Sequence, residues 1–150
     1  MKIAVGADHA GFELKADVVS WIEEMGHEVL DCGTYSPDSV DYSDFAAAVG
    51  AAVVEQRVDL GVLVCGTGQG VAMAANKIRG VRAALCNETY SARLTREHNN
   101  ANILTMGARI VGTGVAREIL DAFLQTPFSQ ETRHQRRIDK MMLLEQSLPV

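Results

Sequence analysis

The sequence predicts an α/β fold: one domain over residues 1–150, a three-layer α/β/α Rossmann-like sandwich around a five-stranded parallel sheet. Short apolar runs alternate with segments of helical periodicity, which is the pattern of a parallel sheet covered on both faces. The run LGVLVC at 60–65 is apolar on both faces, as a central parallel strand should be. A last helical segment has no strand after it, which predicts an extra C-terminal helix.

Each predicted element follows from its own local pattern. Apolar residues recur at helical spacing over 12–26, and Gly26 should end that helix. Pro37 and Asp38 indicate a turn within 34–43. The other predicted helices cover 44–57, 71–78, 88–99, 112–125 and 133–147, and the predicted strands lie within 2–8, 27–33, 59–66, 80–86 and 102–108.

Composition excludes several classes of protein. A net charge of −5 argues against nucleic acid or an anionic membrane as the main partner. No apolar run approaches the roughly 20 residues that span a bilayer, and the N-terminal apolar run is too short for a secretory signal. The three cysteines form no C-x-x-C motif, so neither a zinc site nor a redox pair is expected. Their odd number favours a reducing, cytoplasmic setting.

In such a sheet, ligands bind beyond the carboxyl ends of the strands, near a switch in strand order. We expect the switch early in the sheet. This rule selects four places: Asp8 with His9, Cys65 with the glycines that follow it, the region after Cys86, and the segment 107–109.

The turn after the third strand is rich in glycine. Between Gly66 and Gly70, successive backbone N–H groups could face one point and hold a phosphate or a developing oxyanion. The alternative is a tight strand-to-helix turn without a ligand. Position 71 is Val71, whereas the dinucleotide fingerprint requires a glycine there and a cysteine phosphatase loop requires an arginine. A P-loop is also excluded, because Gly70 is followed by Val71 and Ala72 and not by Lys and then Ser or Thr.

Cys65 directly precedes this turn. Local positive potential favours a thiolate, which can act as a nucleophile or a general base. The alternative for Cys65 is a buried cysteine that acts as a small apolar side chain, and we assign that role to Cys32 and Cys86.

Four further groups of polar residues have both a functional and a structural interpretation. Asp8 and His9 could bind sugar hydroxyls or move protons, or Asp8 could cap the next helix. His98 near a helix end could interact only with the helix dipole. Arg109 could reach the carboxyl edge of the sheet or lie on the surface. Arg133 and Arg137 share a helix face that suits a phosphate, or form a solvated basic face.

The sequence as a whole resembles the ribose/galactose-phosphate isomerase family. Seven motifs carry the resemblance in family order and cover almost the whole chain: GADHAGF at 6–12, DY at 41–42, CGTGQG at 65–70, AANK at 74–77, REHNNANIL at 96–104, GAR at 107–109 and RHQRR at 133–137. The proline that often follows the DY pair is replaced by Ser43, a small departure in one loop.

The resemblance implies a reversible aldose–ketose isomerisation through an enediolate, from ribose 5-phosphate to ribulose 5-phosphate, without metal or cofactor. It implies that Cys65 moves the proton between C1 and C2, that Thr67 assists and that His98 opens the sugar ring. The implied substrate-binding residues are Asp8, His9, Gly66, Thr67, Gly68, Gln69, Gly70, Asn99, Arg109, Arg133 and Arg137. It also implies a homodimer or homotetramer whose sites draw residues from two subunits.

Three alternatives remain open at this point. The substrate could be a six-carbon sugar phosphate, such as allose 6-phosphate or galactose 6-phosphate. The same topology could serve a flavodoxin-like module that binds a nucleotide or FMN. The chain could also be a non-catalytic subunit of a hetero-oligomeric isomerase.

Overall fold

The structure is a computed structural model that describes residues 1–147. Its sheet contains β1 (Lys2–Ala7), β2 (Glu28–Asp31), β3 (Leu60–Cys65), β4 (Ala83–Leu85) and β5 (Ile103–Gly107). The strand order is β2-β1-β3-β5-β4, and every neighbouring pair is parallel. The predicted fold class is therefore confirmed.

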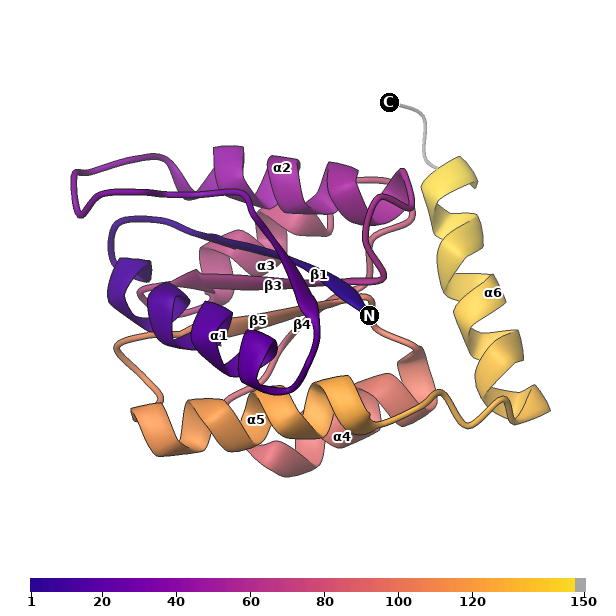
Figure 1. The fold of residues 1–150 in the computed structure, drawn as a ribbon. Coiled ribbons are helices and arrows are strands. Elements are labelled where there is room, and N and C mark those ends of the chain that lie inside the picture. Colours follow the sequence, from indigo (N-terminus) through magenta and orange to yellow (C-terminus); the bar gives the residue numbers. More distant parts are fainter. Residues whose placement is uncertain (148–150) are drawn as a thin grey trace.

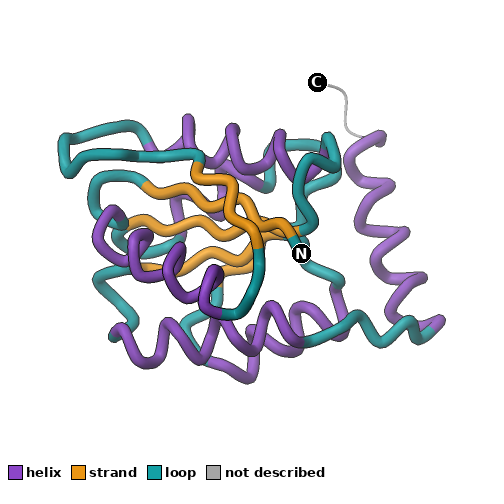
Figure 2. Tube along the Cα trace, in the orientation of Figure 1, coloured by secondary structure: helices purple, strands orange, loops and turns teal. Residues whose placement is uncertain are grey.

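Helices cover both faces of the sheet (Figure 1). On one face lie α2 (Tyr42–Val54) and α3 (Gln69–Ala75); on the other lie α1 (Phe12–Glu24), α4 (Thr89–Asn99) and α5 (Thr113–Gln125). Figure 2 shows the strands enclosed between these two layers. The sixth helix, α6 (Thr132–Ser147), follows without a further strand, as predicted.

The alternation of side chains along β3 divides the core into two halves. Val62 and Val64 pack with the cluster under α1 and α5, whereas Leu63 and Cys65 pack with the cluster under α2 and α3. All six residues of β3 are buried, which explains why this strand is apolar on both faces. Cys65 therefore enters the site from the α2 and α3 side of the sheet.

Two helices begin two residues earlier than the sequence pattern predicts. Helix α2 begins at Tyr42 rather than at residue 44, because Asp41 is extended and serves as its N-cap. Helix α3 begins at Gln69 rather than at residue 71. The left-handed backbone of Gly68 turns the chain directly into this helix, and its carbonyl accepts a hydrogen bond from the amide of Ala72.

The switch in strand order lies between β1 and β3. The chain moves outward from β1 to β2 and then returns to the other side of β1 to form β3. The loop after β1 therefore leads to one face of the sheet and the loop after β3 leads to the other face. The two loops frame a crevice at the carboxyl edge of the sheet. This early switch agrees with the expectation from the sequence.

Helix α6 stands beside the opposite, amino edge of the sheet (Figure 1). It contacts α4, and the carboxylate of Glu145 accepts hydrogen bonds of 3.0 and 3.1 Å from the amide of Gly80. Ile138 is buried, while Met141 and Leu143 are 39% and 56% exposed. Within residues 1–147 the structure contains no helix with the length and apolar character needed to cross a membrane.

Candidate active site

A cavity of about 340 Å³ opens at the switch point, at the carboxyl ends of β1 and β3. It brings together most of the predicted site residues from the loops after β1, β3 and β5. The residues that line it are Asp8, His9, Ala10, Tyr42, Cys65, Gly66, Thr67, Gln69, Gly70, Met73 and Arg109.

The thiol of Cys65 lies at the end of β3 and is only 4% exposed. The loop after the strand folds back over it, and the amide N–H of Gly68 donates a hydrogen bond of 3.1 Å to its Sγ. The next amide, that of Gln69, donates instead to Oγ1 of Thr67 at 3.4 Å. A backbone donor directed at the sulfur stabilises negative charge there.

Two glycines make this arrangement possible. Gly68 has a φ of 76°, a left-handed conformation that a residue with a side chain rarely adopts. Gly107, at the end of β5, lies directly under the loop, and a Cβ at this position would lie 2.6 Å from the carbonyl carbon of Thr67. The glycine loop therefore rests on the bare backbone of the neighbouring strand.

Asp8 does not cap α1, whose N-cap is Gly11, but its carboxylate holds the turn before that helix. Its Oδ1 accepts hydrogen bonds from the amides of Ala10 and Gly11, at 2.9 and 3.1 Å, in the turn that leads into α1. Its side chain is nevertheless part of the cavity wall. The carboxylate thus both fixes the turn and faces the site.

The ring of His9 is oriented by a backbone donor. The amide of Val40 donates to its Nδ1 at 3.3 Å. A neutral ring in this position carries its proton on Nε2 and can donate it to a ligand oxygen. The loop before α2 therefore sets which nitrogen of His9 is the donor.

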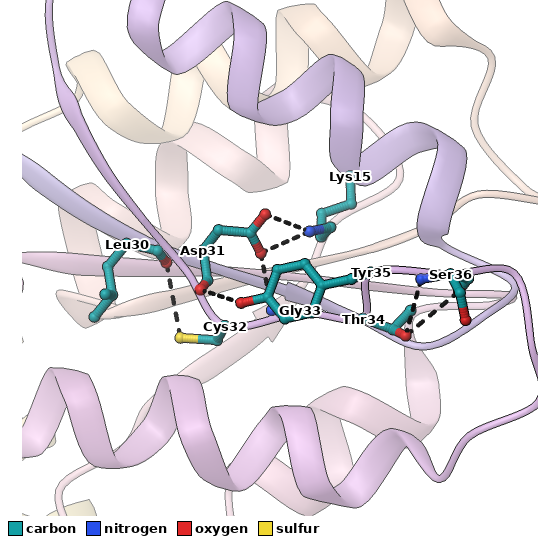
Figure 3. A network of polar contacts seen from close by, with 8 residues as sticks. All are labelled: Lys15, Leu30, Asp31, Cys32, Gly33, Thr34, Tyr35 and Ser36. Carbon is teal, nitrogen blue, oxygen red and sulfur yellow. Dashed lines mark hydrogen bonds and ion pairs between the residues drawn. The ribbon is translucent and has the colours of Figure 1, made fainter.

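A polar network supports the β1 side of the site (Figure 3). The buried Nζ of Lys15 lies 2.6 Å from both carboxylate oxygens of Asp31, and Oδ1 of Asp31 also accepts from the amide of Gly33 at 2.8 Å. Gly33 in turn accepts a hydrogen bond of 2.7 Å from the amide of Ala7. The network extends the pairing of β1 and β2 to the residue before Asp8.

The sequence assigned no role to three residues that line the cavity, Ala10, Tyr42 and Met73. The ring of Tyr42 lies against Gly70, where a Cβ would lie 3.0 Å from the Cζ of the tyrosine. Met73 follows on α3 and is 62% exposed. The DY motif at 41–42 was the available signal for Tyr42, whereas nothing in the sequence marked Met73.

The remaining predicted residues form a second group, away from this cavity. His98 and Asn99 end α4, and Arg133 and Arg137 lie on α6, so this group is at the amino edge of the sheet. Asn99 lines a different cavity, of about 440 Å³, between α4 and α6. Arg133 forms an exposed ion pair of 2.6 Å with Glu131.

His98 packs against a second histidine. The centroids of the His98 and His134 rings are 4.3 Å apart, and Nδ1 of His134 lies 2.8 Å from the hydroxyl of Ser129. Burial lowers the pKa of His134, and the charges of His98 and Arg133 lower it further. His134 is therefore a neutral ring at pH 7, and it supports one face of His98.

The other two cysteines, Cys32 and Cys86, lie outside the lining of the cavity. Burial raises the pKa of Cys86 to about 11. Burial and the nearby carboxylate of Asp31 raise the pKa of Cys32. Both thiols therefore stay protonated at neutral pH, in agreement with the packing role that the sequence assigned to them. Within residues 1–147, no group of three or more His, Cys, Asp or Glu side chains is arranged to hold a metal ion.

A buried thiol in a cavity at the carboxyl edge of a parallel sheet, with Asp8, His9 and Arg109 in the cavity wall, is typical of small-molecule sites in α/β enzymes. The family model for the ribose/galactose isomerases matches residues 3–141. The chain belongs to this family.

Relatives of known sequence or structure match nearly the whole chain. It is 46% identical to ribose-5-phosphate isomerase B of Escherichia coli, over 97% of each protein. The structure of ribose-5-phosphate isomerase B from Clostridium thermocellum superposes with a TM-score of 0.96 at 44% identity, covering 97% of this chain and 98% of the other. The Mycoplasma genitalium enzyme, whose structure has ribulose-5-phosphate bound, gives 0.93 at 41% identity, covering 98% of this chain and 97% of the other.

Proposed function

We propose that this chain is an aldose–ketose isomerase that interconverts ribose 5-phosphate and ribulose 5-phosphate, a step of the pentose phosphate pathway. The observation that carries the proposal is the thiol of Cys65, held beneath the Gly68 amide in a cavity that also contains His9 and Arg109. Family membership over residues 3–141 supports it.

The reaction moves one proton between neighbouring carbons. The thiolate of Cys65 takes the proton from C2 of the open-chain aldose, and the C2 electrons form the double bond of an enediolate. The resulting thiol returns the proton to C1, and the proton of the C2 hydroxyl passes to O1 as the C2 carbonyl forms. The balance is closed, because the product differs from the substrate only in the positions of two protons.

The developing enediolate needs preorganised donors. Loss of one such donor typically costs about 2.7–4 kcal/mol of barrier. The loop amides between Gly66 and Gly70, the hydroxyl of Thr67 and the Nε2 proton of His9 are the donors available in the cavity. In this proposal the loop stabilises the enediolate oxygen, and Asp8 and His9 contact the sugar.

Phosphate binding draws on arginines from two regions. Arg109 lines the cavity, whereas Arg133 and Arg137 are exposed on α6 at the other edge of the sheet. In our proposal these three side chains hold the phosphate together, with the two from α6 supplied by a second copy of the chain. Arginine suits this role because its planar guanidinium binds phosphate oxygens in pairs.

The separation of the site residues into two groups, at opposite edges of the sheet, supports a homo-oligomer whose sites are shared between subunits. His98 and Asn99 are at the amino edge, so they complete a site only on a neighbouring subunit. The exposed apolar side chains of Met141 and Leu143 on α6 support such an assembly, as a dimer or as a tetramer. A cytoplasmic location belongs to the same proposal, and the three free cysteines support it.

A coupled assay of the purified chain tests the function. Ribose 5-phosphate, allose 6-phosphate and galactose 6-phosphate are supplied separately, each with and without EDTA, and formation of the ketose is followed. We expect the highest kcat/KM with ribose 5-phosphate and no effect of EDTA. A higher kcat/KM with a six-carbon sugar phosphate would change the assigned substrate. Loss of activity in EDTA would contradict the metal-free mechanism, and no activity at all would contradict the function.

A further inference from the structure

Thr105 is a buried polar side chain that the reaction as described does not use. It lies in β5 and is 0% exposed, and its neighbours along the strand, Leu104 and Met106, are equally buried and apolar. A hydroxyl in such a place is unfavourable unless it has a hydrogen-bond partner. The hydroxyl of Thr105 should therefore have a specific hydrogen-bond partner.

The hydroxyl of Thr105 reaches the glycine loop. Its Oγ1 donates a hydrogen bond of 3.0 Å to the carbonyl oxygen of Gly68. Gly68 is also the residue whose N–H donates to Sγ of Cys65 at 3.1 Å. Two consecutive hydrogen bonds thus connect a side chain in the core of the sheet with the sulfur.

Register explains why this position can make the contact. Thr105 pairs with Leu63 and Gly107 pairs with Cys65, so Thr105 lies two residue pairs deeper in the sheet than the thiol. Residues two apart on a strand face the same side, and Ile103 on this strand packs in the cluster that contains Cys65. The hydroxyl therefore lies beneath the loop, on the face from which Cys65 enters the site.

The backbone of the loop already rests on β5. The amide of Arg109 donates to the carbonyl of Gly66 at 3.0 Å, and the missing Cβ of Gly107 leaves room for Thr67. These contacts fix how closely the loop approaches the strand. The Thr105 hydroxyl adds a directional contact at the carbonyl of Gly68, in the peptide unit that follows the N–H donor to the sulfur, and thereby restrains the residue that carries this donor.

We propose that Thr105 is a positioning residue for the isomerisation, because its hydroxyl holds Gly68 with the N–H directed at the Cys65 sulfur. The inference rests on the proposed role of Cys65 in proton transfer. Thr105 itself touches neither the substrate nor the reacting atoms. Its contribution is to the placement of the base, so it should affect kcat more than KM.

The test replaces the hydroxyl without changing the volume of the side chain. In Thr105→Val we expect a kcat for ribose 5-phosphate that is about tenfold lower, with KM within about twofold, which corresponds to the net effect of one hydrogen bond. Thr105→Ser keeps the hydroxyl and should restore kcat to within about threefold of wild type. A kcat of Thr105→Val within twofold of wild type overturns the proposal, and so does equal impairment of the Val and Ser variants.

A matched control exists at the end of α5. Thr126 donates its hydroxyl to the carbonyl of Ala122 at 2.6 Å, a contact of the same kind away from the lining of the cavity. Thr126→Val should leave kcat and KM unchanged. If Thr105→Val does not fold, the pair Thr105→Ser and Thr105→Ala decides, because the two differ in the hydroxyl alone. Equal kcat values in that pair overturn the proposal.

A second measurement does not depend on turnover. The rate of alkylation of Cys65 by iodoacetamide at neutral pH is followed by peptide mass spectrometry in wild type, Thr105→Val and Thr126→Val. We expect it to fall several-fold only in Thr105→Val, because the amide donor no longer stabilises the thiolate. An unchanged rate overturns the inference. Inactive wild-type protein with this selective fall would contradict the proposed function and leave the positioning role standing.

Discussion

Cys65 and His98 lie at opposite edges of the same sheet. Cys65 ends β3 at the carboxyl edge, whereas α4 runs back across the sheet and brings His98 to the amino edge. A strand of this length spans roughly 20 Å, which is beyond the reach of any side chain. The two residues therefore cannot act on one substrate within one copy of the chain.

Mixing two inactive variants tests whether a site is shared. We expect Cys65→Ala and His98→Ala to be inactive alone, and to recover about a quarter of the wild-type activity after subunits are exchanged, since half of the dimers are mixed and each of these has one intact site. The measurement is the rate of ribulose 5-phosphate formation after joint refolding. Mixed dimers without activity would show that the two residues do not belong to one shared site.

Gly107→Ala tests the close approach of the glycine loop to β5. The added Cβ would meet the backbone of Thr67, so we expect a loss of about 1–3 kcal/mol in the free energy of unfolding and a lower kcat. Gly114→Ala is the control, because a Cβ at Gly114 meets nothing within 4 Å. Denaturant unfolding and the isomerase assay measure both variants. Equal behaviour of the two would contradict the packing of the loop on the strand.

Selective alkylation tests the difference between the three cysteines. Burial raises the pKa of Cys86 to about 11, and burial together with Asp31 raises the pKa of Cys32, so both remain thiols at neutral pH. We expect iodoacetamide to modify Cys65 first, and ribose 5-phosphate to protect it. Peptide mapping over time measures the order, and Cys65→Ala provides the control. Faster labelling of Cys32 or Cys86 would contradict this assignment.

His134 should make stability depend on pH. Burial, followed by the charge of His98, lowers its pKa in the folded state below the ordinary 6.5. The unfolded chain therefore binds this proton first, so the contribution of His134 is complete above about pH 6.5 and is lost as the pH falls through the lowered value. We expect Tm to fall over this range in wild type and to fall less in His134→Asn. Equal slopes would show that another group causes the effect.

The sequence predicted most of the fold because its signals are local. Apolar runs and helical spacing located every strand and helix, and Gly26 does end α1, with a φ of 78°. Boundaries differed where backbone conformation decides them. Helix α3 begins right after the left-handed Gly68, two residues before its periodicity becomes visible.

The site was predictable in part. The rule for parallel sheets correctly grouped Asp8, Cys65 and Arg109 at one edge. The polar network around Lys15 and the contact of Thr105 with the loop depend on residues far apart in the sequence, so no local pattern could have indicated them.

Turnover by Cys65→Ala tests the central claim most directly. The account predicts a kcat for ribose 5-phosphate at least about 10³-fold below wild type, because the base that moves the carbon-bound proton is gone. Calorimetry should show that this variant still binds the sugar phosphate, since the arginines are intact. A kcat close to that of wild type would contradict the assignment of Cys65 as the base.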